Sequence, residues 1–314
     1  MDLIEKFIHH LQLELASSAN TVEAYRRDLR QWADFATQGQ PRQLDPLSVT
    51  ASDLRLYIGH LASRKLSPTS IKRKASALRT FYRYLLRQEM IDVSPAEGLS
   101  TPKSPKPIPV YIRPAETGAI LDAPATADNL DDFQSVRDAL IMEILYDTGM
   151  RSTELVTLKD SQIDTLRGEL KVLGKRNKER VIPFGPRLAR RIDRYRTLRD
   201  SSPRTAICAT DPDAPLLVRT DGQPVYRQLI YKVVHRTLSE GGAHAARLSP
   251  HVMRHSCATD MLNAGAPIAS VQQMLGHASL ASTQIYTHVT YKDLKTNYQL
   301  AHPRAQKKGG PNGN

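Results

Sequence analysis

The chain has 314 residues, with 44 Lys or Arg against 32 Asp or Glu, a net charge of +12 and a pI near 9.7. This length suggests two domains that can each bury a core, and the excess of cations suits a polyanionic partner, because each neutralised phosphate releases counterions. Only two cysteines occur, far apart at Cys208 and Cys257, which argues against a disulfide scaffold and fits a reducing compartment. No signal peptide is evident, and no run approaches the ~20 apolar residues of a bilayer span, so we expect a cytoplasmic protein without membrane contact.

The first hundred residues are predicted to be helical, because their apolar residues recur at helical spacing. Polar residues that can cap a helix precede most of these apolar runs. Four helices are expected, beginning near Leu3, at Asn20, at Thr50 and at Ser67.

A long basic stripe occupies the third and fourth of these helices. Between Leu54 and Gln88 there are nine Lys or Arg residues and no Asp or Glu. A stripe of one sign repels itself unless an anion lies against it. Such a run is usually a solvated helix face, but the absence of any interleaved acid favours phosphate binding here. The candidate phosphate-binding residues are Lys72, Arg73, Lys74, Arg79 and Arg83.

Residues 101–114 contain five prolines. Because proline fixes φ and disfavours helix in the residue before it, we expect an extended linker and a domain boundary here.

The second domain is expected to begin with helices. An apolar stripe from Phe133 to Leu145 ends at a Thr-Gly pair. Residues 169–184 alternate as two short strands around a polar turn, and 215–219 is a candidate further strand. From Val225 onward the pattern is helical again, interrupted by glycines, of which Gly276 is expected to end a helix.

Six residues of the second domain could act together on one phosphodiester. Tyr286 is a candidate nucleophile, and the other five are cations or proton donors. Two guanidiniums can hold the non-bridging oxygens, a lysine can protonate the leaving oxygen, and histidines can move protons. The predicted catalytic residues are Arg151, Lys175, His251, Arg254, His277 and Tyr286.

Structural alternatives exist for the residues of this set. Arg151 opens a short helix and could simply pair with Glu154, which we interpret as its structural partner. The predicted hairpin turn holds both Lys175 and Lys178, and the residues alone favour neither as the general acid.

His251 and Arg254 are three residues apart on one expected helix, so they share a face. Ser249-Pro250 makes a good helix start. In the first turn the positive helix end disfavours a charged imidazole, so His251 could act as a base toward the tyrosine. Both residues could instead be ordinary surface groups.

His277 and Tyr286 are the least specific of the six on their own. His277 could merely cap helix carbonyls, and the chain has twelve tyrosines, of which Tyr231, Tyr291 and Tyr298 are nearby rivals. No carboxylate cluster of the kind that holds catalytic metals accompanies the set, and no Gly-rich nucleotide loop is present. We therefore expect activity without a metal ion or a nucleotide cofactor.

Together, Thr148-Gly-Met-Arg-Ser-Thr-Glu-Leu155, Ser249-Pro-His-Val-Met-Arg-His255, Leu275-Gly-His277 and Tyr286 resemble the tyrosine recombinase (phage integrase-like) family, and its Xer subgroup most. The resemblance implies a mainly α fold with a small β-sheet, and it favours Lys175 over Lys178. It implies a helical core-binding (SAM-like) DNA-binding domain at 1–100, a linker at 101–114, an α+β catalytic domain at 115–302, and a disordered tail at 303–314.

The resemblance also implies an activity. Tyr286 would form a 3′-phosphotyrosyl link to double-stranded DNA, and exchange would proceed through a four-way junction in a tetramer of identical or paralogous recombinases. The last helix would dock on the next protomer, with Leu294, Tyr298 and Leu300 as candidate contacts. Chromosome-dimer resolution is the role this subgroup implies, with a DNA translocase as a candidate partner.

Other functions stay open at this point. An integrase of a phage or other mobile element would use the same chemistry, and a type IB topoisomerase would share the nucleophile. A non-catalytic DNA-binding protein, or a basic helical adaptor for RNA, would bind nucleic acid without needing Tyr286.

Overall fold

A computed structural model describes residues 2–13, 19–39, 44–103, 111–126, 132–174, 179–207, 211, 213–245, 247–276 and 291–305. The chain divides into two compact units, Met1–Lys106 and Pro107–Asn314. Part of the predicted linker, residues 104–110, lies outside the described residues. Among the helices described, none is long and apolar enough to cross a membrane.

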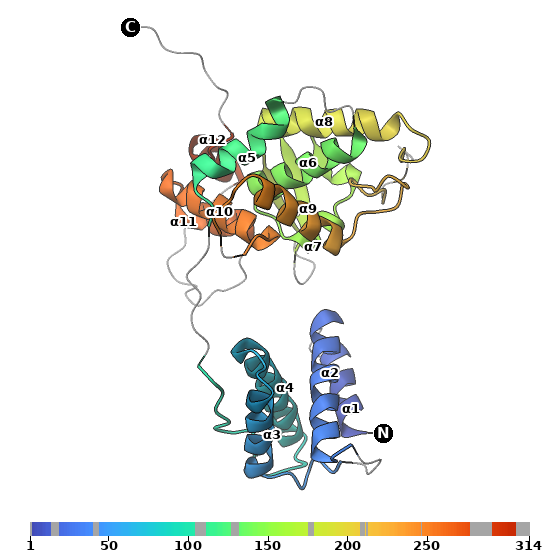
Figure 1. Cartoon of the computed structure of the whole chain (residues 1–314), viewed down its shortest axis with the longest axis vertical. Coiled ribbons are helices and arrows are strands. Elements are labelled where there is room, and N and C mark those ends of the chain that lie inside the picture. The colour runs from blue at the N-terminus through green and yellow to red at the C-terminus, as the bar shows by residue number, and fades with distance from the viewer. Residues whose placement is uncertain are drawn as a thin grey trace. The chain divides into compact units, whose positions relative to one another are not determined.

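The N-terminal unit is built from helices, as predicted (Figure 1). Thr50 caps the third helix in a capping box, accepting from the amide of Asp53 while its own amide donates to the Asp53 carboxylate. Ser67 caps the fourth, and the second begins at Ala19, slightly before the predicted cap. The helices are α1 (Leu3–Leu13), α2 (Ala19–Ala36), α3 (Ala51–Ser63) and α4 (Pro68–Arg87).

One apolar core holds this unit together. It contains apolar residues of all four helices, whereas Leu13 and Leu56, also predicted on the apolar faces, are 68% and 67% exposed. Trp32, Phe81 and Tyr82 are almost fully buried and contact one another, with ring centroids 5.3–6.2 Å apart.

The C-terminal unit combines helices with a three-stranded antiparallel sheet in the order β1-β2-β3. The predicted hairpin is confirmed, with Leu170 opposite Ile182 and Val172 opposite Arg180. The elements are α5 (Pro114–Thr126), α6 (Phe133–Thr148), α7 (Ser152–Val156), η1 (Asp160–Gln162), β1 (Ile163–Asp164), β2 (Glu169–Leu173), β3 (Glu179–Pro183), α8 (Pro186–Asp200), α9 (Arg227–Glu240), α10 (Pro250–Asn263), α11 (Ile268–Leu275) and α12 (Tyr291–Ala301).

The strand suggested at 215–219 is not present. This segment makes only two isolated bridges, Lys159 with Pro215 and Val218 with Pro224. The prolines have no N–H to donate, so a continuous ladder cannot form there.

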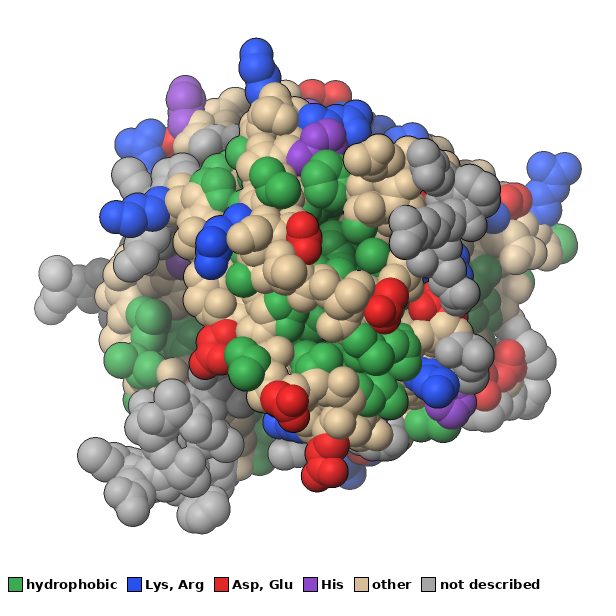
Figure 2. Space-filling model, turned by 90° about the horizontal axis from the view of Figure 1, so that it is seen from below, with side chains coloured by type: hydrophobic (Ala, Val, Ile, Leu, Met, Phe, Trp, Pro, Cys, Tyr) green, Lys and Arg blue, Asp and Glu red, His purple; other side chains and the backbone are tan. Residues whose placement is uncertain are grey.

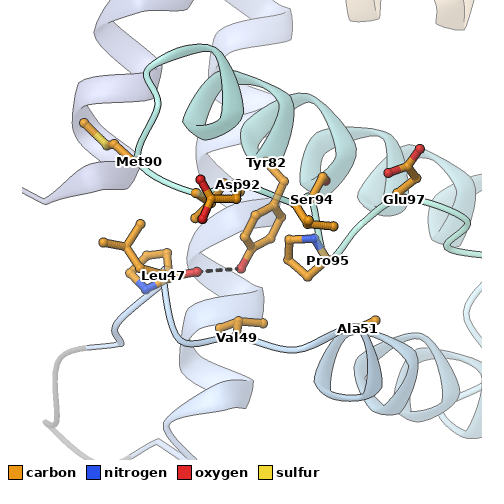
Figure 3. A pocket seen from close by; sticks show the side chains of 12 residues that line it. Leu47, Val49, Ala51, Tyr82, Met90, Asp92, Ser94, Pro95 and Glu97 are labelled. Carbon is orange, nitrogen blue, oxygen red and sulfur yellow. Dashed lines mark hydrogen bonds between the residues drawn. The ribbon is translucent and has the colours of Figure 1, made fainter.

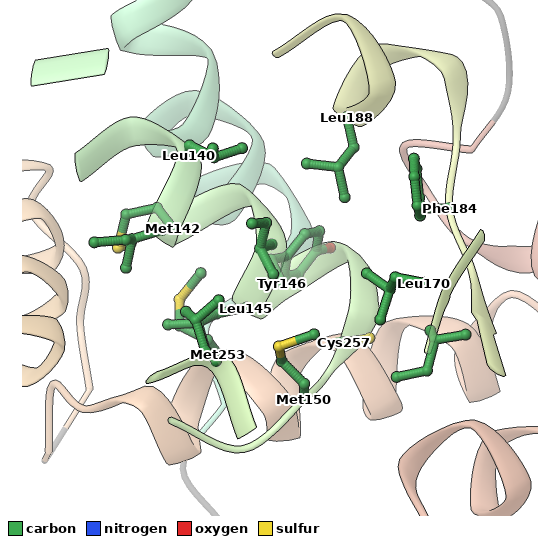
Figure 4. Close-up of a cluster of buried hydrophobic side chains, with 14 of the residues drawn as sticks. Leu140, Met142, Leu145, Tyr146, Met150, Leu170, Phe184, Leu188, Met253 and Cys257 are labelled. Atoms are coloured by element: carbon green, nitrogen blue, oxygen red, sulfur yellow. The ribbon is translucent and has the colours of Figure 1, made fainter. Parts of the chain in front are cut away.

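Helix α6 lies at the centre of the C-terminal core. Nearly every residue from Val136 onward is buried, because α5, α8, α9 and α10 pack around it. Figure 4 shows side chains of α6, α10 and the sheet meeting in one cluster, which includes Tyr146, Leu170, Met253 and Cys257.

The C-terminal helix packs on its own unit. Leu294 and Tyr298 of α12 are buried against this core, whereas Leu300 is 67% exposed. The two buried residues therefore stabilise the C-terminal unit itself, and only Leu300 presents its apolar surface outward. Of the three predicted contacts with a neighbouring protomer, Leu294 and Tyr298 are thus not accessible in this structure.

The residues after α12 are anchored by ion pairs in the interior. Arg304 contacts Glu143 at 2.7 Å and Asp147 at 3.6 Å, and both carboxylates are almost fully buried. His302 is buried too, and its ring stacks on Tyr298 with centroids 4.7 Å apart. The segment 302–305 is therefore part of the folded unit, although the prediction placed 303–314 in a tail.

We expect His302 to make the unit less stable in acid. Burial, with Arg304 adding to it, lowers the pKa of His302 from 6.5 to about 3. Protonation therefore favours the unfolded chain, so the contribution of His302 to stability is present above pH 6.5 and is lost as pH falls toward 3.

The substitution His302→Phe keeps the stacked ring and removes the titration. The wild type should lose stability between pH 7 and pH 5 and the variant should not. The free energy of unfolding of the variant minus that of the wild type should therefore rise by about 2 kcal/mol, since each pH unit below 6.5 corresponds to about 1.4 kcal/mol. Denaturant unfolding at several pH values measures this difference. Parallel pH profiles for the two proteins would show that His302 titrates normally in the folded state.

Candidate active site

The site begins where α6 ends. Gly149 caps this helix with φ of 58°, and its N–H donates to the carbonyl of Leu145. A Cβ on Gly149 would lie 2.6 Å from Leu275 Cδ2, so a side chain would collide with the end of α11. The tight turn that this glycine permits brings Arg151 to the N-cap position of α7.

Glu154 is the partner of Arg151, as expected. The guanidinium donates to Glu154 Oε1 at 2.9 Å and the backbone N–H of Arg151 donates to Oε2 at 2.8 Å. Arg180 of β3 donates to the same two oxygens, at 3.0 and 2.8 Å. Burial raises the pKa of Glu154, but the hydrogen bonds from Arg180 and Arg151 reverse this and lower it overall. Glu154 is therefore a buried carboxylate shared by two guanidiniums.

Arg254 extends from the first turns of α10 into the same region and is only 9% exposed. It donates to the carbonyl of Gly149 at 2.6 Å and to that of Leu275 at 2.8 Å. Burial, together with the charges of Arg151 and Arg180, lowers its pKa to about 10. It is still charged at neutral pH, and these two bonds leave other N–H groups of its five for a substrate.

Three successive carbonyls at the end of α11 each accept from a different arginine. Arg180 donates to Met274 at 2.9 Å, Arg254 to Leu275 at 2.8 Å and Arg151 to Gly276 at 3.4 Å. We name this set, with Glu154, the arginine cluster. It holds three guanidiniums and one carboxylate, so it carries a net charge of two positive. Arg151 is its most accessible member, with 36% of its side chain exposed.

His251 lies in the first turn of α10, one turn before Arg254. The helix begins at Pro250 after Ser249, as predicted, and the His251 side chain is exposed. The structure therefore brings Arg151 and Arg254 together and leaves His251 accessible at the nearby helix start.

Three predicted residues lie outside the described residues: Lys175, His277 and Tyr286. The chain is described up to the position before two of them. Gly174 follows β2, and Gly276 ends α11 with φ of 66°, as predicted for this glycine. His277 therefore directly follows a residue whose carbonyl is bound by Arg151.

Arg180 is the arginine of the cluster that is not among the predicted site residues. The alternation of the hairpin does contain a signal for it. Leu170, Val172 and Ile182 are buried, and the register places Arg180 opposite Val172 on their side of the sheet. An arginine at an inward strand position needs a buried anion, and Glu154 provides it.

In the N-terminal unit, part of the basic stripe is neutralised by another helix. Lys74 is buried and donates to Asp28 of α2 at 2.9 Å, and Arg73 pairs with the same carboxylate. Arg79 donates to the carbonyl of Leu99. The anion that the stripe requires is thus partly supplied by the chain itself, whereas Lys72 and Arg83 are exposed.

A different face of this unit is apolar and acidic. An open pocket of about 710 Å³ is lined by Leu47, Met90 and Val93 together with Asp92 and Glu97 (Figure 3). Val93 is 72% exposed. Residues 44–54 and 88–102, which form these walls, contain no Lys or Arg. Hydrophobic and acidic side chains also lie together in the middle of the view in Figure 2.

Comparison with known proteins gives two family matches. The model described as "Phage integrase family" matches residues 111–293, and "Phage integrase, N-terminal SAM-like domain" matches residues 4–89. Among curated relatives, tyrosine recombinase XerC of Chlorobaculum parvum is 35% identical, covering 96% of this chain and 94% of its own. Tyrosine recombinase XerD of Proteus mirabilis is 37% identical, covering 96% and 93%.

Solved structures with the same fold include the Tn1549 transposon integrase in complex with transposon right-end DNA, with a TM-score of 0.71 and 19% identity over 95% of this chain and 99% of that one. The XerH site-specific recombinase bound to palindromic difH substrate has a TM-score of 0.69 and 20% identity, covering 95% and 83%. The helical fold with its small sheet and the relatives in sequence agree, and this chain belongs to the phage integrase family as a Xer-like tyrosine recombinase, an enzyme that breaks and rejoins DNA.

Proposed function

We propose that Arg151 and Arg254 of the arginine cluster bind the scissile phosphate of double-stranded DNA, and that Tyr286 attacks this phosphate. The observation that carries the proposal is the convergence of Arg151 and Arg254 on adjacent carbonyls at the end of α11, immediately before His277. Two guanidiniums fixed by backbone groups are already oriented before substrate arrives, so little reorganisation is needed in the transition state.

The chemistry can be followed bond by bond. A bond forms between the Tyr286 oxygen and phosphorus while the bond from phosphorus to the 5′ oxygen breaks. His251 accepts the phenolic proton, and Lys175 gives a proton to the leaving 5′ oxygen. Arg151 and Arg254 bind the non-bridging oxygens throughout. A free 5′ hydroxyl of the partner duplex then attacks the phosphotyrosyl phosphorus and releases Tyr286. The phosphotyrosyl link conserves the energy of the broken bond, so no nucleotide is needed.

The charge of the cluster suits this reaction. A phosphodiester has one negative charge, and attack by a phenolate adds a second in the five-coordinate transition state. The net charge of two positive on the arginine cluster balances the transition state better than the ground state, which is the condition for catalysis. His277 would add one hydrogen bond to the phosphoryl group.

We propose chromosome-dimer resolution as the biological role. The relatives named XerC and XerD, which match over nearly the whole chain, support it. In this role the chain would act in a tetramer around paired duplexes, with identical or paralogous subunits and with a DNA translocase as a candidate activator. The alternative is integration of a mobile element, which would use the same chemistry.

The first test is capture of covalent protein–DNA adducts from the genome of the source organism. Wild-type protein should yield adducts at defined sites, and Tyr286→Phe should yield none, since it lacks the attacking oxygen. One site near the replication terminus supports dimer resolution, and sites at the ends of a mobile element support the alternative. Adducts that persist in Tyr286→Phe would assign the nucleophile to another residue.

A second prediction concerns the N-terminal unit. We expect Lys72 and Arg83 to contact phosphates, because they are exposed cations of the stripe. Lys72→Ala and Arg83→Ala should each weaken binding to a mixed-sequence duplex a few-fold and reduce the slope of log K against log salt by about 1. Fluorescence anisotropy at several salt concentrations measures both.

Two controls accompany these variants. Val93→Ser lies in the apolar and acidic pocket and should leave affinity and slope unchanged. Lys74→Met removes one partner of buried Asp28, so it should lower the unfolding free energy by about 1–3 kcal/mol with little effect on the salt slope. If Lys74→Met reduced the salt slope by about 1 and Lys72→Ala left it unchanged, this assignment would be contradicted.

A further inference from the structure

The side chain of Arg180 makes three hydrogen bonds to two protein groups. Its Nη1 and Nη2 groups bind both oxygens of Glu154, and its Nε donates to the carbonyl of Met274 at 2.9 Å. The side chain is only 11% exposed. These contacts join β3, α7 and the end of α11. The guanidinium of Arg180 thus donates to protein acceptors.

The first consequence concerns the charge on Arg151. Glu154 has a single negative charge and two oxygens, and both oxygens accept from Arg180 as well as from Arg151. Without Arg180, the carboxylate would be free to neutralise Arg151 alone in a two-pronged ion pair. Sharing therefore leaves Arg151 with uncompensated positive charge toward the exposed side, where a phosphate can approach.

The second consequence concerns the start of the segment that carries His277. A Cβ on Gly276 would lie 3.1 Å from Cδ, 3.2 Å from Nε and 3.3 Å from Cζ of Arg180. The arginine side chain thus runs directly against Gly276, whose φ of 66° also favours glycine. Arg180 and this glycine together fix the point where the chain leaves α11.

The third consequence concerns the hairpin. Arg180 is the second residue of β3, and residues 175–178, which include Lys175, directly precede this strand in the sequence. The hydrogen bonds from Arg180 to Glu154 therefore hold the start of β3 against α7.

We propose that Arg180 is a positioning residue for DNA strand cleavage: it holds Glu154 so that the charge of Arg151 is not fully compensated and its side chain stays oriented, and it fixes the start of β3 and the end of α11, which lead along the chain to Lys175 and His277. It acts through these groups and does not touch the DNA. This inference rests on the proposed role of the arginine cluster in cleavage.

The test is the rate of covalent adduct formation in a single turnover at saturating protein. The substrate is a duplex carrying a genomic site recovered by adduct capture, with a nick beside the scissile phosphate so that the released strand is lost. Arg180→Met and Arg180→Lys should both slow the reaction by about 10–100-fold, the range for residues that orient a catalytic group. Lysine keeps the charge but cannot bind both oxygens of Glu154.

Arg199→Met is the matched control for general destabilisation. Arg199 is also buried, and it binds the carboxylates of Asp160 and Asp200 and the carbonyl of Leu216. Assayed below the melting temperature of each variant, Arg199→Met should cleave at nearly the wild-type rate. If it slows cleavage as much as Arg180→Met does, Arg180 is merely structural and the proposal fails.

A double-mutant cycle with Glu154 tests the route of the effect. If Arg180 acts by holding Glu154, the variant that combines Arg180→Met with Glu154→Gln should be slowed much less than the product of the two single effects. Fully multiplicative effects would overturn the proposal. Should Arg180→Met not fold, Arg180→Lys alone decides, and a wild-type rate for it also overturns the proposal.

These outcomes are distinct from failure of the proposed function. If wild-type protein forms no adduct that depends on Tyr286, the proposed cleavage chemistry itself is wrong. If wild-type protein cleaves and Arg180→Lys cleaves equally fast, the chemistry stands and only the role of Arg180 is rejected.

Discussion

The shared carboxylate of Glu154 is the interaction on which the site depends. A carboxylate that is only 7% exposed is costly unless every oxygen is satisfied, and here both oxygens accept from Arg180 and from Arg151. One negative charge between two guanidiniums keeps the arginines in place without cancelling them. With Arg254 added, the cluster keeps the excess positive charge that a phosphoryl transfer without a metal ion would need.

Backbone geometry completes this arrangement. Gly149 and Gly276 both adopt positive φ and lie against Leu275 and Arg180, respectively, so the end of α6 approaches α11, and the end of α11 approaches β3, more closely than side chains would allow. The last carbonyls of a helix lack partners within it and carry partial negative charge, which makes them natural acceptors for cations. The arginines thus donate to the last carbonyls of α11, and these carbonyls in turn orient the arginines. Removal of one contact should therefore disturb several catalytic groups together.

Much of this could be predicted from the sequence, because the signals were local. Helix caps, the hairpin and the helix end at Gly276 each depend on neighbouring residues. The remaining features depend on distant partners. Asp28 and Lys74 are 46 residues apart, so a stripe considered along one helix could not reveal the acid that pairs with it. Likewise, the apolar face of α12 shows that Tyr298 must be buried, but not which surface buries it. Predicting the role of Arg180 would have required both its inward position on the strand and knowledge of a carboxylate distant in the sequence.

The most direct test of this account replaces the scissile phosphate of the recovered site with an uncharged methylphosphonate. If the arginine cluster acts by balancing negative charge, Arg151→Ala should be slowed strongly on the phosphate duplex and far less on the methylphosphonate duplex, relative to wild-type protein on each. Equal slowing on both substrates would contradict the account, because Arg151 would then serve the fold or DNA docking and not the charge of the reacting group.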